Sequence, residues 1–124
     1  MKKLFKTVLV TSVALLCFSC YYNEFPEEEE DVSIDPDQEI SFANDIIPIF
    51  VTYNCTQCHN GNQDPDLRAG NEYNSLVPDY VTENNANNSE LYTKLAVENH
   101  KDLDLTNIEL EYIKEWINRG AENN

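Results

Sequence analysis

The chain has 124 residues, of which 23 are acidic and 8 are basic, and its formal net charge at pH 7 is −15. This length is enough for one modest domain. Nucleic acids and anionic membranes would repel so acidic a chain, so we expect no nucleic acid among its partners.

Residues 1–19 have the features of a targeting segment. Lys2, Lys3 and Lys6 make its start positive, and residues 8–18 form a nearly continuous apolar run. That run is shorter than the roughly 20 residues that span a bilayer, but it suits the apolar core of a signal peptide. We therefore predict a signal peptide over residues 1–19, with an uncleaved membrane anchor as the alternative.

Cys20 follows this segment directly. The pair Ser19-Cys20 resembles the lipobox of bacterial lipoproteins. The resemblance implies that Cys20 is lipidated and becomes the mature N-terminus. The protein would then lie in the bacterial cell envelope, on its periplasmic or outer-surface side, anchored to a membrane without spanning it. The alternative is ordinary secretion with a free Cys20 thiol.

Residues 20–39 are expected to form an acidic, disordered tether. This stretch contains the acidic run 27–31, Pro26 and Pro36, and few apolar residues. Like charges repel one another, so such a block stays extended and cannot bury a core. An acidic run after a lipidated cysteine also resembles the surface-export signal of some Gram-negative lipoproteins, and a plain spacer is the alternative.

The folded domain is predicted over residues 40–124, and its first helix over residues 45–54. Asp45 is the expected N-cap, which would place Pro48 in the first turn, where its missing N–H has no helical partner. This helix should run directly into Cys55. Its apolar stripe, with spacings of three and four, comprises Phe42, Ile46, Ile49, Phe50 and Tyr53.

Two shorter helices are predicted in the middle of the domain. They cover residues 72–77 and residues 90–97, and Ser89 is the expected cap of the second. The side chains of the second that should face inward are Leu91, Tyr92 and Leu95. Polar connections are predicted over residues 60–66, 82–88 and 99–104.

The last helix has the clearest signals. Thr106 and Glu109 have the spacing of a capping box, in which the glutamate reaches back to the cap residue. Gly120 lies where helices commonly end in a left-handed turn. The expected apolar face comprises Ile108, Tyr112, Ile113, Trp116 and Ile117. No segment alternates as a strand would, so we predict an all-α domain of about four helices.

The segment Cys55-Thr56-Gln57-Cys58-His59 has the C-x-x-C-H spacing of a c-type haem attachment site. Two thiols three positions apart can add to the two vinyl groups of one haem, and the adjacent histidine can bind the iron. Cys55 and Cys58 would then be thioether anchors and His59 the proximal ligand. A thioredoxin-like redox pair needs a strand before Cys55, and a structural zinc site needs a second pair of ligands. The sequence shows neither.

Beyond this motif, the domain resembles the small single-haem cytochrome c domains of bacterial lipoproteins, over most of residues 41–124. The segments that carry the resemblance are residues 42–50, 54–61, 73–77, 89–92 and 116–121. It implies a cytochrome c-like helical domain of class I, in which the N- and C-terminal helices cross near one covalent haem c. Phe50 and Trp116 would contact the haem there; their alternative role is that of ordinary core aromatics.

The sequence departs from the family at the second axial ligand. The usual ligand is a methionine before the last helix, but the only methionine here is Met1. His100 lies near the expected position, and we predict it as the distal iron ligand. Lys94, Lys101, a water molecule or an open site are the alternatives. Two imidazoles would give a low-potential, six-coordinate, low-spin haem, because a methionine ligand raises the potential.

These predictions favour an electron carrier over an enzyme. The haem iron would exchange electrons with redox partner proteins that the sequence does not identify. Two other functions stay open at this point. One is a haem enzyme, such as a peroxidase, or a gas-binding protein with an open distal site. The other is a surface lipoprotein whose haem domain mainly docks a partner.

Overall fold

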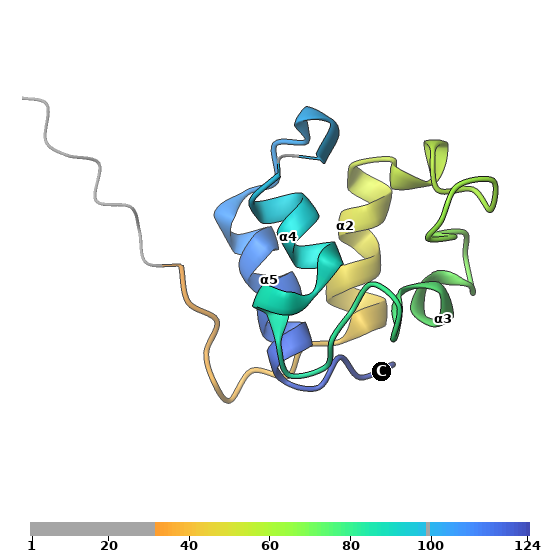
Figure 1. Ribbon diagram of the computed structural model, residues 1–124. Helices are drawn as coiled ribbons and strands as arrows, with labels where there is room; N and C mark the ends of the chain where they lie inside the picture. The colour runs from red at the N-terminus through yellow and green to blue at the C-terminus, as the bar shows by residue number, and fades with distance from the viewer. Residues whose placement is uncertain (1–31, 99) are drawn as a thin grey trace, which may run out of the picture. The chain divides into compact units, whose positions relative to one another are not determined.

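The computed structural model, which describes residues 32–98 and 100–124, contains four α-helices joined by short helical turns and loops. None of these residues forms a strand, so the predicted all-α class is confirmed. The predicted signal peptide and Cys20 lie outside the described residues. Within the described part, no helix is both long enough and apolar enough to cross a membrane. The helices are α2 (Ile47–Thr52), α3 (Glu72–Leu76), α4 (Glu90–Ala96) and α5 (Asn107–Asn118) (Figure 1).

The first helical segment is built differently from the prediction. A π-helical turn, η1 (Phe42–Ile46), precedes α2, and its N-cap is Ser41 rather than Asp45. The Ser41 hydroxyl accepts the Asn44 N–H at 3.2 Å, while an Asp45 carboxylate oxygen accepts the Ser41 N–H at 2.7 Å. This reciprocal pair caps the helix one turn earlier than expected, and Asp45 takes part from inside the helix. Pro48 lies at the start of α2, where it is tolerated.

The last helix begins as predicted. The Thr106 hydroxyl accepts the Glu109 N–H at 3.4 Å and a Glu109 carboxylate oxygen accepts the Thr106 N–H at 2.9 Å, so the capping box is confirmed. Ile113, Trp116 and Ile117 are buried, but Ile108 is 40% exposed. Ile108 precedes Ile117 by nine residues, and at roughly 100° per residue the two lie on opposite sides of the helix. The expected apolar face was therefore wrong at Ile108.

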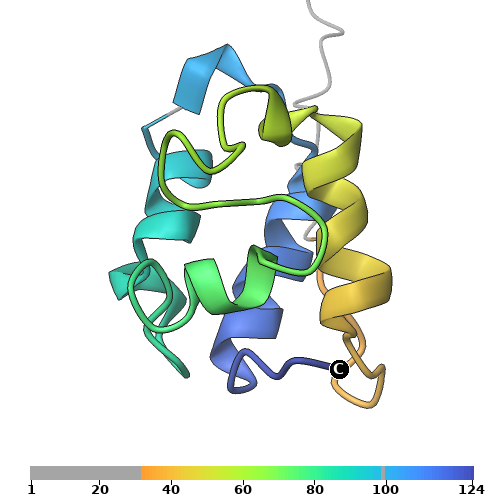
Figure 2. The same ribbon diagram turned by 90° about the vertical axis from the view of Figure 1, so that its right-hand side faces the viewer.

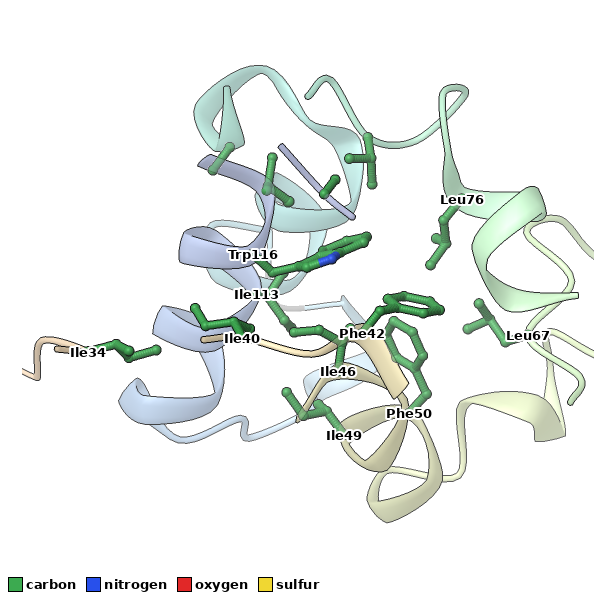
Figure 3. Packing of buried hydrophobic residues seen from close by; sticks show 14 residues of the cluster. Ile34, Ile40, Phe42, Ile46, Ile49, Phe50, Leu67, Leu76, Ile113 and Trp116 are labelled. Carbon is green, nitrogen blue, oxygen red and sulfur yellow. The ribbon is translucent and has the colours of Figure 1, made fainter. Parts of the chain in front are cut away.

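The helices surround one core. α5 packs against η1 and against α4, and the chain between α2 and α4 crosses in front of them in Figure 2. The Trp116 ring, from α5, lies 5.0 Å from the Phe42 ring between centroids, and Tyr73 meets Phe42 edge-on at 5.4 Å. Figure 3 shows the rings of Trp116, Phe42 and Phe50 inside this core. Trp116 is thus a core aromatic.

The compact unit begins at Val32, eight residues before the predicted domain start at residue 40. Ile34 and Ile40 are buried in the core cluster. The Arg119 guanidinium donates to the carbonyl oxygen of Gln38 at 2.6 Å. The Gln38 amide in turn donates to the Tyr112 hydroxyl at 2.9 Å. The tether predicted over residues 20–39 therefore overlaps the folded unit at residues 32–39, because these contacts hold that stretch on α5.

Asn124 joins α5 to the start of the fold. Its side-chain oxygen accepts the Phe42 N–H at 2.8 Å, and its side-chain nitrogen donates to the Ile40 carbonyl at 3.1 Å. Its backbone carbonyl accepts the Ala43 N–H at 3.0 Å. The side chain therefore satisfies one of the free N–H groups at the first turn of η1.

Asn124→Ala should lower the free energy of unfolding by about 1–2 kcal/mol, because two hydrogen bonds of about 1 kcal/mol each are lost. Urea unfolding followed by circular dichroism measures this difference. Asn123→Ala is the matched control, since within the described residues no side-chain hydrogen bond involves Asn123. Equal midpoints for the two variants would contradict the role of Asn124.

Candidate functional site

A cavity of about 560 Å³ lies between the end of α2, the chain that follows it, α4 and the segment before α5. This volume is within the range of small-molecule and cofactor sites. Its walls are mostly apolar, with Phe50, Leu67, Leu76, Leu91, Leu95 and Leu105 among the lining side chains. Leu91 and Leu95 of α4 thus face inward, as predicted. Phe50 lines the cavity and Trp116 does not.

Cys55, Cys58 and His59 all line one part of this cavity. The predicted helix does not run into them, because α2 ends at Thr52 and Asn54 adopts a left-handed conformation with φ 51°. Asparagine tolerates that conformation better than most residues. The chain then forms a short 3₁₀ turn, η2 (Cys55–Gln57), and the Cys55 carbonyl accepts the N–H groups of both Cys58 and His59. One tight turn therefore presents both thiols and the imidazole.

The two cysteines carry free thiols that differ in their surroundings. Cys55 is half-buried and Cys58 is exposed. Burial raises the pKa of the Cys55 thiol above its ordinary value, and the nearby Cys58 adds to this effect. Both thiols therefore lie at one edge of the cavity, and Cys55 is the less exposed of the two.

His59 is oriented by the loop that follows it. Its Nδ1 atom lies 3.1 Å from the Pro65 carbonyl oxygen. A carbonyl oxygen only accepts, so the hydrogen bond requires the proton on Nδ1 and leaves the lone pair of Nε2 for another partner. Histidines that bind metals use this arrangement. The Leu67 N–H also donates to the His59 carbonyl at 2.9 Å, which fixes the loop against the turn.

An ion pair stiffens the same loop. Asp66 accepts the Arg68 Nε–H at 2.9 Å and an Arg68 terminal N–H at 2.7 Å. It also accepts the Asn71 side-chain amide at 2.9 Å. The hydrogen bonds from Arg68 hold the pKa of Asp66 well below its ordinary range. The Arg68 guanidinium also lies over Gly61, whose φ is +87°. The left-handed φ at Gly61 favours glycine, and any other side chain would also displace this guanidinium.

His100 lies across the cavity from His59. Their ring centroids are 6.0 Å apart and the ring planes make an angle of 38°. His100 belongs to a 3₁₀ turn, η4 (His100–Asp102), in which Lys101 and Asp102 have φ values of 58° and 56°. Burial lowers the pKa of His100, and the charges of His59 and Lys101 lower it further. His100 is therefore held in the neutral form that binds metals.

The spacing of the two rings suits one metal atom between them. A metal–imidazole nitrogen bond is about 2 Å long, and a ring nitrogen lies roughly 1 Å from its centroid. Two imidazoles on opposite sides of one metal therefore have centroids roughly 6 Å apart, as His59 and His100 do.

The donors present fit a haem better than the alternatives. A haem iron takes only one or two ligands from the protein. In the described part of the chain, no three His, Cys, Asp or Glu side chains are arranged so that they could all bind one metal ion, as a structural zinc site would require. No strand precedes Cys55 there, so the setting of a thioredoxin-like pair is also missing.

Comparisons with protein-family models, with curated proteins and with solved structures returned no match to this chain. The site therefore rests on its geometry, which brings together the four residues that the sequence identified: Cys55, Cys58, His59 and His100. Sequence reasoning missed the Pro65 carbonyl, because a backbone acceptor leaves no side-chain signal. It also missed the polar role of Tyr53, which has the spacing of an ordinary core residue.

Proposed function

We propose that this protein is an exported, lipid-anchored c-type cytochrome that carries one covalent haem c and transfers electrons. The observation that carries the proposal is the meeting of Cys55, Cys58 and His59 on one part of an apolar cavity, with His100 opposite His59. The cavity volume of about 560 Å³ supports a ligand of cofactor size.

Each residue has a defined task in this proposal. The sulfur atoms of Cys55 and Cys58 hold the haem edge through thioether bonds, and His59 Nε2 is the proximal ligand. The Pro65 carbonyl keeps His59 in the required tautomer. His100 is the distal ligand. When bound, the haem supplies a reversible one-electron couple.

The net charge of the chain, rather than the charge of the cavity lining, favours a particular kind of redox partner. Lys94 and Lys101 are the two basic side chains that line it, and they suit the anionic carboxylates of a haem. The chain as a whole has a net charge of −15. A positively charged partner protein would be steered toward so acidic a surface.

A haem enzyme or gas-binding protein is the second candidate, and it requires an open distal side. The ring centroids of His100 and His59 are 6.0 Å apart. This distance favours a closed, six-coordinate iron instead. A lipoprotein that mainly docks a partner would not need two imidazoles facing each other across a cavity.

The proposal is tested by expressing the full chain in the envelope of a bacterium that attaches haem to exported proteins. The purified protein should contain one haem per chain that resists acid–acetone extraction and gives a c-type spectrum in alkaline pyridine. A protein that folds but retains no covalent haem would refute the proposal.

A further inference from the structure

Tyr53 connects the two sides of the cavity. It follows α2 directly, lies two residues before Cys55 and lines the cavity. Its hydroxyl oxygen lies 2.8 Å from a Glu109 carboxylate oxygen and 2.9 Å from the Asp104 carbonyl oxygen. Asp104 lies in the segment between His100 and α5, and Glu109 lies in the first turn of α5. One side chain beside the cysteine turn therefore holds the segment that carries the opposing histidine.

The Glu109 carboxylate is a strong hydrogen-bond acceptor. The same carboxylate oxygen also accepts the Thr106 N–H at 2.9 Å and the Thr106 hydroxyl at 2.7 Å. Burial alone would raise the pKa of Glu109, but the hydrogen bonds from Thr106 and Tyr53 outweigh it and hold the pKa below its ordinary value. The carboxylate is thus ionised at neutral pH, and hydrogen bonds to charged acceptors are about twice as strong as neutral ones.

The segment from His100 to Thr106 needs contacts with other parts of the fold to keep its conformation. Lys101 and Asp102 both have positive φ values, which are costly for residues other than glycine. Within the segment, the backbone hydrogen bond that closes the turn runs from the Leu103 N–H to the His100 carbonyl at 3.2 Å. A turn with strained residues and few internal bonds keeps its shape only if its surroundings fix it.

We propose that Tyr53 is a positioning residue, which holds residues 100–106 so that His100 faces His59 across the cavity. This inference rests on the proposed function, because it gives His100 the role of distal ligand. It concerns the hydrogen bonds of the Tyr53 hydroxyl and not its ring, which Tyr53→Phe keeps in place.

The first test compares the full chain, as purified with both cysteines intact, with its Tyr53→Phe variant. Amide hydrogen exchange at Leu103 and Thr106 should become roughly tenfold faster in the Tyr53→Phe background, because a charge-assisted hydrogen bond of more than about 1.4 kcal/mol is lost. Tyr73→Phe is the matched control. It also removes one hydroxyl hydrogen bond, to the Ala121 carbonyl at 2.9 Å, but away from the cavity, and should leave these two amides unchanged.

The second test uses the haem-loaded protein. Tyr53→Phe should keep its covalent haem, gain a high-spin ferric fraction and bind carbon monoxide roughly tenfold faster when reduced, because His100 leaves the iron more often. Glu109→Gln weakens the acceptor at similar size and should shift both readouts the same way. Unchanged exchange and unchanged carbon monoxide binding would overturn the positioning role alone. A wild-type protein without covalent haem would overturn the proposed function, and the role of Tyr53 with it.

Discussion

Replacing Cys55 and Cys58 together by serine should abolish covalent haem attachment. Serine hydroxyls are far weaker nucleophiles than thiols and do not form the thioether bonds that c-type attachment requires. The haem-free protein should also lose stability, by about 3–5 kcal/mol or more, since a cavity of about 560 Å³ loses its apolar content. Alkaline pyridine spectra measure the haem, and urea unfolding measures the stability.

Single variants and a neighbouring control sharpen this result. Cys55→Ser and Cys58→Ser each leave one sulfur, so a haem held by one bond should give a shifted pyridine spectrum rather than none. Gln57→Ala alters the same turn without touching a thiol and should keep a normal spectrum. Unaltered covalent haem in the double variant would show that these two cysteines are not the attachment site.

His100→Ala should turn a low-spin, six-coordinate ferric haem into a high-spin one. If His100 is the distal ligand as proposed, carbon monoxide could bind the wild-type iron only in molecules from which His100 has dissociated. If the iron is open in about one molecule in a hundred, removing His100 raises the apparent affinity about 100-fold. His100→Met tests the ligand further, because a Met/His pair raises the reduction potential and adds a sulfur-to-iron charge-transfer band.

Lys101→Ala is the control for this experiment, because it changes the adjacent position of the same turn and lines the same cavity. It should stay low-spin. A low-spin His100→Ala protein would assign the distal position to another side chain, such as Lys94. A wild-type protein that is already high-spin and binds carbon monoxide rapidly would support the open-site enzyme instead.

The parts of the fold that depend on local chemistry could be predicted from the sequence. The capping box of Thr106 and Glu109 was found because both partners lie within one helical turn. The same holds for the positive φ of Gly120, at 105°. The α3 and α4 helices also end within a residue of their predicted bounds, at Leu76 and Ala96.

The errors arose where distant contacts decide the structure. Ser89 is the N-cap residue of α4 as predicted, but its hydroxyl bonds Thr82 and Asn85 and makes no cap bond to the helix. Ser89 is fully buried, so its polar group must be satisfied by whatever lies near it. Residues 32–39 were assigned to the tether on charge, proline content and the scarcity of apolar residues. Arg119, more than 80 positions away, holds them on the fold.

The candidate site likewise combines residues that local spacing identifies with residues that only the fold brings together. The C-x-x-C-H spacing identifies three residues on one turn, and that information is local. His100 was proposed because it is the second of two histidines and the one methionine, Met1, lies outside the predicted domain. Only the fold brings its ring centroid to 6.0 Å from that of His59. The link from Tyr53 to Glu109 spans 56 positions, and no spacing rule in the sequence could have revealed it.

Because the folded unit begins at Val32, the distance between this domain and a membrane-anchored Cys20 has an upper limit. If Cys20 is lipidated as proposed, twelve residue steps separate the lipid from the fold. At about 3.3–3.6 Å per residue, this linker is at most about 40 Å long. A fold beginning at residue 40 would allow a linker of about 70 Å. A linker of this length would keep a haem bound as proposed close to the membrane, where its effective concentration would be high for partners at the same surface. The electron donor or acceptor should accordingly be found at that membrane surface.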